Sequence, residues 1–283
     1  MAKIWKYSFL KTPKGRSLAP RPLLFCFFSL FLNHLAPAQN ADSIPLAYSF
    51  DAQVQVLGSD KLKQIYFVSP RQVLYKCNEQ GKVLFEFSNR YLGTLGKIDA
   101  SDPFDILLYY PDYQTLLFLD RSLNVTADIR LKAEQFPLPA LVALSRDRQV
   151  WIYDAGLNTL NRTDRQGSIK SSSQDLSLLL GRRFSPNQLV CNERGVYLVD
   201  PEQGVLSFDL FAQFQAFLPL MGVEQLQAFD QYLLYRQQGI YYVGETIGNA
   251  QALQGLPTGL LLFTGLPNWI VAWDGTKILR FQK

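Results

Sequence analysis

The chain reads VWIYDAGLNTLNRTD from residue 150 to residue 164 and VYLVDPEQGVLSFD from residue 196 to residue 209. Each stretch has a short run of β-branched and aromatic residues, then a polar turn, and then a second largely apolar run. Runs of this composition form β-strands, and the Gly, Pro, Asn and Asp residues between them form tight turns. The two stretches therefore predict two antiparallel hairpins of the same design.

Copies of this unit recur before and between the two stretches. The positions equivalent to Ala155 in the turn are Pro70, Pro111 and Pro201, so that successive copies are 41, 44 and 46 residues apart. Many of the strands are apolar on both faces, which is typical of sheets buried between two neighbouring sheets. Repeats of about 40–50 residues with several strands each are typical of β-propellers, in which four-stranded blades stand side by side in a ring.

We predict an all-β fold, namely a single six-bladed β-propeller of four-stranded antiparallel blades. Two weaker copies, at residues 226–243 and 260–281, complete the six units. The last copy is one strand short, and the segment 44–50 supplies the missing strand, so that an N-terminal strand closes the ring. A short helix is expected at residues 175–180, between the third and fourth units.

Two parts of the repeat array, residues 141–169 and 188–217, carry a resemblance to a known family. In each, the second strand ends in an acidic turn, at Asp154 or Asp200, and the third strand precedes a polar turn. With this layout the chain resembles six-bladed propellers of the NHL and TolB-like kind, and it is similar to exported propellers of unassigned function in Bacteroidota. The resemblance covers nearly all of residues 39–283 and implies a binding platform, although lactonases and lyases also occur among such proteins. It carries no catalytic residue over to this chain, because a fold does not settle a function.

Residues 1–38 have the composition of a secretory signal peptide. Six basic and no acidic residues occupy positions 1–21, an apolar run extends from Leu23 to Leu35, and Ala36-Pro37-Ala38 forms an A-x-A site. The alternative is a retained membrane anchor, but the run has 13 residues, whereas about 20 are needed to span a bilayer. We therefore expect cleavage after Ala38, a propeller domain of residues 39–283 without a transmembrane helix, and export to the periplasm, the outer membrane or the cell surface.

The composition argues against several classes of activity. The chain has 28 basic and 24 acidic residues, a formal net charge of +4, and without the six basic residues of the leader it carries −2. A near-neutral domain gives no electrostatic reason to expect nucleic acid as a partner. The one histidine, His34, lies in the leader, so that the domain has none for a Ser-His-Asp triad or a histidine zinc site. We predict no cofactor, no metal and no catalytic residue.

Two cysteines, Cys77 and Cys191, remain in the propeller domain. An even number in an oxidising compartment favours a disulfide. The repeat, however, places these cysteines in the first and fourth units, on opposite sides of the ring, whereas a disulfide requires Cα atoms within about 7 Å. We predict two separate thiols.

The candidate partner-binding residues lie in the loops between second and third strands and in the connections between units, which share one face of a propeller around its channel. They are Arg71, Asp112, Tyr113, Asp154, Asn158, Asp200, Glu202, Arg182 and Arg183. This mixture of charged and aromatic side chains is suited to a protein loop or a glycan. The alternative interpretation is that turns are polar because they face water, with Asp and Asn capping their own backbone.

A further cluster at the start of the second unit contains Lys97, Asp99, Asp102 and Asp105. We place Lys97, Asp99 and Asp102 in a connection on the same face. Carboxylates are ligands of Ca²⁺, but the spacing does not follow the calcium-loop pattern. A pair of such carboxylates also suits general acid and base chemistry on a sugar.

Two hypotheses for the function follow. The first is a non-catalytic binding or scaffolding propeller of the cell envelope, a monomer or a subunit of a complex, which engages a protein partner through its loops. The alternative is a glycan binder, or an enzyme acting on carbohydrate or a lactone, which uses channel-mouth carboxylates such as Asp99, Asp154 and Asp200. Several carboxylates with raised pKa values converging on the channel would favour the alternative.

Overall fold

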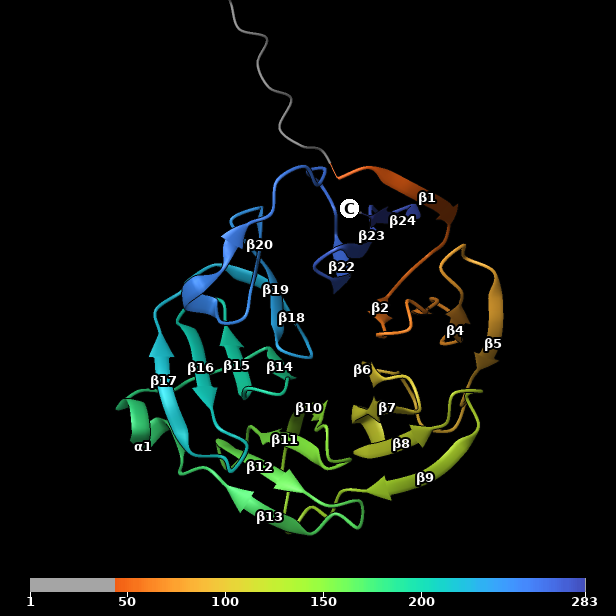
Figure 1. The fold of residues 1–283 in the computed structure, drawn as a ribbon. Coiled ribbons are helices and arrows are strands. Elements are labelled where there is room, and N and C mark those ends of the chain that lie inside the picture. Colours follow the sequence, from red (N-terminus) through yellow and green to blue (C-terminus); the bar gives the residue numbers. More distant parts are fainter. Residues whose placement is uncertain (1–43, 283) are drawn as a thin grey trace, which may run out of the picture. The chain divides into compact units, whose positions relative to one another are not determined.

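A computed structural model of the protein describes residues 44–282 (Figure 1). The predicted leader, residues 1–38, and its cleavage site lie outside the described residues. The described chain forms six four-stranded antiparallel sheets, and each sheet is one blade of a β-propeller. The predicted fold class and blade number are confirmed.

The first three blades follow one another along the chain. Blade 1 contains β2 (Val56–Ser59), β3 (Ile65–Val68), β4 (Leu74–Cys77) and β5 (Val83–Phe87). Blade 2 contains β6 (Lys97–Asp102), β7 (Asp105–Tyr110), β8 (Thr115–Leu119) and β9 (Val125–Arg130). Blade 3 contains β10 (Pro139–Leu144), β11 (Val150–Asp154), β12 (Thr159–Thr163) and β13 (Ile169–Ser172).

The other three blades include the one that joins the two ends of the described chain. Blade 4 contains β14 (Gln188–Cys191), β15 (Val196–Asp200), β16 (Gly204–Phe208) and β17 (Phe214–Leu218). Blade 5 contains β18 (Val223–Phe229), β19 (Tyr232–Gln237), β20 (Ile240–Gly244) and the two-residue β21 (Gln251–Ala252). Blade 6 contains β22 (Leu262–Leu266), β23 (Trp269–Trp273), β24 (Lys277–Gln282) and β1 (Leu46–Asp51).

The first strands of the blades surround the centre of the ring. Figure 1 shows β2, β6, β10, β14, β18 and β22 innermost, with the fourth strands outside. Each innermost strand contacts the innermost strands of both neighbouring blades, including β22 with β2. This arrangement creates a central channel whose wall consists of six first strands.

The N-terminal strand closes the ring, as predicted. β1 is the outermost strand of blade 6 and pairs with β24, with Ser49 opposite Leu279 and Phe50 opposite Ile278. The indole N–H of Trp273 also donates a hydrogen bond to the Ala52 carbonyl oxygen at 2.9 Å. Both ends of the described chain therefore share one sheet, and β1 covers the edge of β24 that would otherwise be unpaired.

The core lies between the blades. Every residue of the second strands β3, β7, β11 and β15 is buried. Sheets stacked face to face leave neither face of these strands in water, which explains why their sequences are apolar without alternation. Trp151 of blade 3, for example, packs with Phe208 of blade 4 in one buried cluster.

Residues 44–282 contain three short helices, which lie in loops or turns. They are η1 (Pro111–Tyr113), α1 (Leu176–Leu180) and η2 (Ile247–Asn249). The predicted helix is confirmed as α1, which begins after Asp175, whose carboxylate accepts the Ser177 N–H, and which ends at Gly181 with a φ of 65°. No helix among residues 44–282 is long and apolar enough to span a bilayer.

The two cysteines are separate thiols, as predicted. Cys77 lies in β4 of blade 1 and Cys191 in β14 of blade 4, and neither forms a disulfide. Burial raises the pKa of Cys77 to about 11 and that of Cys191 to about 12. Both thiols therefore stay protonated near neutral pH and behave as small apolar groups.

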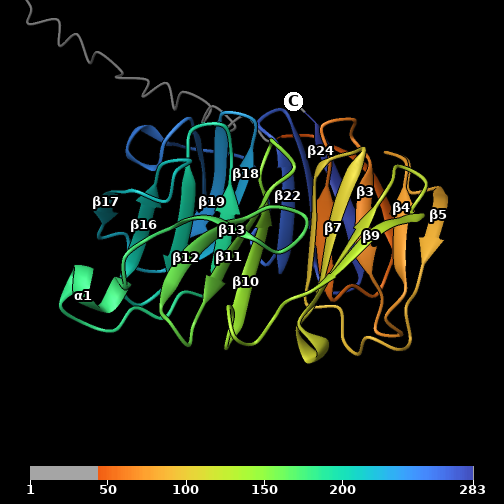
Figure 2. The same ribbon diagram turned by 90° about the horizontal axis from the view of Figure 1, so that it is seen from below.

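The ends of the strands define two faces. We call the side with the loops between second and third strands, and with the connections between blades, the loop face. The side with the turns between first and second and between third and fourth strands is the turn face. Figure 2 shows the blades edge-on, with α1, which belongs to the connection from β13 to β14, at the loop-face side.

Candidate binding sites on the loop face and in the channel

Asp154 anchors the loop-face end of blade 3. Its carboxylate is buried, and its oxygens accept N–H hydrogen bonds from Leu138 at 2.9 Å and from Leu157 at 2.8 Å. Leu138 precedes β10 and Leu157 lies in the β11–β12 loop, so that one side chain joins the connection from blade 2 to the loop of blade 3. Asp112 of blade 2 makes the corresponding bond with the N–H of Thr94 at 2.8 Å.

Asp200 has the same role in blade 4. Its buried carboxylate accepts the N–H groups of Ser185 at 3.1 Å and Glu202 at 2.9 Å, and the side-chain amide of Gln203 at 2.9 Å. Asp154 and Asp200 were predicted to meet a partner or to serve an enzyme. They lie beneath the loop face, where backbone groups occupy their oxygens, and they shape the loops above them.

A hollow of about 530 Å³ opens on the loop face between the β11–β12 loop and the connection that carries α1. Three predicted residues, Asn158, Arg182 and Arg183, line this arginine hollow together. Both arginines are exposed, and Leu157 in the same lining is 48% exposed. In its wall, the Tyr153 hydroxyl donates a hydrogen bond to Asn158 Oδ1 at 2.7 Å, and burial raises the pKa of Tyr153 to about 12.

The remaining predicted residues lie elsewhere on the loop face. Arg71 is exposed in the β3–β4 loop of blade 1, and Glu202 is exposed in the β15–β16 loop of blade 4. Asp112 and Tyr113 belong to η1. Tyr113 lines a separate hollow of about 410 Å³ beside β8 and β9, together with residues that include Arg130. The loop face therefore brings together only part of the predicted set in one site.

Seven exposed apolar side chains of the described chain lie on the loop face. They are Tyr91, Tyr113, Leu138, Leu157, Leu178, Met221 and Leu261. Tyr91 and Leu178 are 87% and 81% exposed. Except for Tyr113, none of these residues was predicted. A large apolar residue within an otherwise polar connection was the signal that could have identified them.

The predicted acidic cluster does not form one site, and its placement in a loop was wrong. Residues 97–102 are strand β6 of the channel wall, which runs from Lys97 at the loop face to Asp102 at the turn face. Asp99 accepts the Leu144 N–H of β10 at 2.8 Å, whereas Asp105 forms an ion pair with Arg165. No three His, Cys, Asp or Glu side chains among residues 44–282 are arranged to hold a metal ion.

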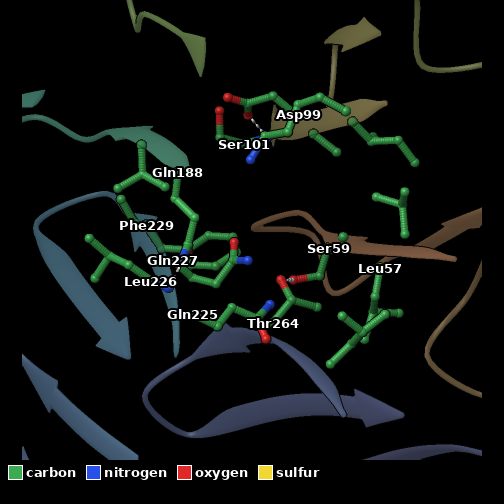
Figure 3. Close-up of a pocket in the computed structure, with 18 of the residues that line it drawn as sticks. Leu57, Ser59, Asp99, Ser101, Gln188, Gln225, Leu226, Gln227, Phe229 and Thr264 are labelled. Atoms are coloured by element: carbon green, nitrogen blue, oxygen red, sulfur yellow. Dashed lines mark hydrogen bonds between the residues drawn. The ribbon is translucent and has the colours of Figure 1, made fainter. Parts of the chain in front are cut away.

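The channel contains a cavity of about 300 Å³, shown in Figure 3. Most of the polar side chains of its wall bridge neighbouring blades. Gln188 of β14 accepts the Leu226 N–H at 2.7 Å, Gln225 of β18 donates to the Phe263 carbonyl oxygen at 2.8 Å, and the hydroxyls of Ser59 and Thr264 are 2.9 Å apart. These bonds join the wall strands, and nothing in the sequence distinguished these residues from ordinary polar positions.

Lys97 is the exception in the channel wall. It lies at the loop-face end of β6, is half-buried and lines the cavity. Burial lowers the pKa of Lys97, and the nearby Asp99 carboxylate acts in the opposite direction.

Comparisons with known proteins identify the fold. No family model matches the chain, and no curated protein matches it either. A streptogramin B lyase structure matches with a TM-score of 0.56 and 11% identity, over 83% of this chain and 87% of that one. The Neurospora crassa Pan2 WD40 domain matches with a TM-score of 0.55 and 12% identity, over 85% of this chain and 96% of that one.

A third match is the structure of a catalytically inactive virginiamycin B lyase from Staphylococcus aureus with quinupristin. It has a TM-score of 0.53 and 12% identity, over 82% of this chain and 81% of that one. The likeness is one of fold. At such identities it transfers no site and no activity.

Proposed function

We propose that the protein is a non-catalytic scaffold of the cell envelope that binds a protein partner through its loop face. The arginine hollow is the observation that carries this proposal. It combines two exposed guanidinium groups, Arg182 and Arg183, with the exposed side chain of Leu157. Arginine and large apolar residues side by side are typical of the centres of protein interfaces.

The apolar residues around the hollow extend the surface a partner would cover. Leu138 lies against Gly156, next to Leu157 in the same loop. Leu178 of α1 precedes the two arginines in the sequence and exposes most of its side chain. Exposed apolar side chains next to such a hollow are a sign of an interaction site.

The charge of the hollow favours an acidic partner segment. No ion pair joins Arg182 or Arg183 to a carboxylate within residues 44–282. The Arg182 guanidinium lies 5.2 Å from the Phe217 ring, a cation–π distance that limits its freedom before binding. A guanidinium held in this way loses little entropy when it takes up a carboxylate.

The location in the envelope rests on the leader at residues 1–38, and the same face has room for a glycan as a second ligand. The alternative of an enzyme with channel-mouth carboxylates has less support. Asp154 and Asp200 already accept backbone N–H groups, and Asp99 accepts that of Leu144. These three carboxylates do not converge on one point of the cavity wall, since only Asp99 lines it.

An affinity capture from the cell envelope with charge-reversed variants tests the proposal. The mature protein should retain a stoichiometric partner, and the R182E/R183E variant should lose at least nine-tenths of it. The matched control is K82E/R121E, which makes the same change of charge on exposed turn-face residues and should retain the partner. Equal retention by both variants, or capture of no partner by the unchanged protein, would count against the proposal.

A further inference from the structure

The charged side chains of the channel cavity are paired, with one exception. Glu224 and Arg236 form an ion pair of 2.6 Å, and the second oxygen of Glu224 accepts the Gly239 N–H at 3.0 Å. Arg236 donates in addition to the Leu260 carbonyl oxygen. Each of these two charges therefore has an oppositely charged partner in the cavity wall.

Asp99 is also satisfied by the protein. One carboxylate oxygen accepts the Ser101 N–H at 3.1 Å and the other accepts the Leu144 N–H at 2.8 Å. This bonding fixes the carboxylate between β6 and β10. Its charge lowers the cost of a nearby cation, but its position is set by the backbone of both strands.

Lys97 remains as the unpaired charge of the wall. Its ammonium has no hydrogen-bond acceptor and no ion-pair partner within residues 44–282, although it lines the cavity. A cation held deep in a protein without an acceptor is unfavourable unless water or an anion reaches it. Burial, which lowers the pKa of Lys97, is the physical sign of this deficit.

Two neutral groups of the wall are also unused. The half-buried side chains of Gln227 and Ser101 also line the cavity, and neither the amide nor the hydroxyl forms a hydrogen bond within residues 44–282. Figure 3 shows Gln227, from β18, reaching toward the open centre, and Ser101, from β6, on another side of it. Leu57 and Leu226 supply apolar wall between these polar groups. One cation, one amide and one hydroxyl therefore line the same cavity.

We infer that the channel binds a small hydroxylated carboxylate, a sugar acid, with its carboxylate on Lys97 and its hydroxyl groups on Gln227 and Ser101. The carboxylate of the ligand pairs with the Lys97 ammonium, which is the one unpaired charge of the cavity in the described chain. The hydroxyl groups of the ligand form hydrogen bonds with the Gln227 amide and the Ser101 hydroxyl. A ligand of this class is small enough for a cavity of about 300 Å³. The inference does not depend on the partner proposed for the loop face. That partner is proposed to bind the arginine hollow of blades 3 and 4, whereas Lys97 belongs to blade 2.

Calorimetric titration with glucuronate, galacturonate and gluconate tests this inference, with glucose as the uncharged comparison. At least one of the acids should bind the unchanged protein, and glucose should bind at least tenfold more weakly. The K97M variant should lose at least tenfold in affinity for that acid, and Q227A should lose a smaller factor. The control K82M removes an exposed lysine of the turn face and should bind as the unchanged protein does.

The outcomes that overturn the inference are definite. Absence of binding by all three acids means that water alone solvates Lys97. Equal affinity for glucose and the acids, or full affinity in K97M, excludes Lys97 as the anion partner. If K97M is poorly folded by circular dichroism, K97Q replaces it, because the amide keeps polar contact with the cavity. The R182E/R183E variant should bind the acid normally, so that this inference and the proposed function fail separately.

Discussion

The turn face and the loop face are built from similar residues that are used in different ways. On the turn face, an Asx residue opens the turn between third and fourth strands in each of blades 1 to 4. In each turn, its Oδ1 accepts the N–H groups two and four residues later, at 2.8–3.0 Å. These residues are Asn78, Asp120, Asp164 and Asp209. Each turn therefore satisfies itself and resembles the others.

The loop face uses its acids over longer distances. Asp112, Asp154 and Asp200 each bond to a segment that precedes the first strand of their own blade. The connections they hold differ in length and sequence, and one of them contains α1. Apolar side chains and two arginines stay exposed there. Large apolar residues such as Phe211 are exposed on the turn face too, but the two arginines without an ion pair in the described chain and the hollow that they line belong to the irregular loop face.

The largest effect should come from breaking a loop-face anchor. The change Asp154→Ala removes a buried carboxylate and leaves two part-buried N–H groups without acceptors, and we expect a loss of about 3 kcal/mol in the free energy of unfolding. Urea unfolding measures it. The control Asp112→Ala removes one bond of an exposed residue and should cost about 1 kcal/mol or less. Equal losses for the two variants would mean that burial does not distinguish these anchors.

A turn-face acid should matter less for stability and not at all for binding. Asp209→Ala removes the acceptor of the Phe211 and Gln213 N–H groups in a partly exposed turn. By analogy with helix caps, the expected cost is about 1 kcal/mol. Asp209→Asn keeps the acceptor and should recover most of it. If Asp209→Ala reduced partner capture as much as R182E/R183E, the two faces could not be separated as we propose.

Two kinds of turn-face carboxylate should change the stability of the protein in opposite directions as the pH falls. Hydrogen bonding from Asn124 lowers the pKa of Asp120 below its ordinary value of 3.8, and the side chain of Lys170 does the same for Asp164. The stability from a lowered carboxyl pKa is present above 3.8 and is lost as the pH falls through the lowered value. The double variant D120N/D164N should therefore lose less stability on acidification than the unchanged protein.

Asp60 provides the control of opposite sign. Burial raises its pKa, although Gln64, Tyr66 and Leu62 donate hydrogen bonds to it. The charged carboxylate is thus disfavoured in the folded state, and the folded state gains as the pH falls through the raised value. D60N should lack this gain. Thermal unfolding at about pH 5 and about pH 3 measures how the stability of both variants changes with pH. If D120N/D164N and D60N differed from the unchanged protein in the same direction, the assigned causes would be contradicted.

The smallest change in stability is expected at the apolar rim of the arginine hollow. Leu157→Ser replaces an exposed side chain and should change the free energy of unfolding by no more than about 0.5 kcal/mol. It should nevertheless reduce partner capture severalfold, because an apolar contact at the centre of the interface is lost. Phe211→Ser, on the turn face, is the matched control and should reduce neither the free energy of unfolding nor partner capture. A destabilised Leu157→Ser protein would show that this residue is structural.

The sequence predicted the blades because buried strands have a composition that turns lack. β11 and β15 are continuous apolar runs that end at an acid, and this repeats with the length of a blade. β6 was missed because Lys97, Asp99 and Asp102 give it the charge of a loop. Its buried Ile98 and Ala100 alternate with residues that line the channel, and this period of two was the available signal.

The sites were harder to predict because they depend on which blades become neighbours. Asn158, Arg182 and Arg183 were predicted from the polar composition of the loops that contain them. The burial of Asp154 and Asp200 depends on N–H groups from segments 15 or 16 residues earlier, which turn chemistry does not reveal. β21 was missed for another reason, since Gln251 and Ala252 have no strand composition and pair only because β20 is beside them.

The central claim is that the partner sits on the loop face, and site-specific photo-crosslinking in the cell envelope tests it most directly. A photoreactive amino acid would replace Leu157 on the loop face in one variant and Phe211, which is 67% exposed on the turn face, in another. We predict that the Leu157 probe forms one dominant crosslinked product, that the Phe211 probe does not, and that R182E/R183E abolishes the product. The same product from both positions, or a product from Phe211 alone, would contradict the claim.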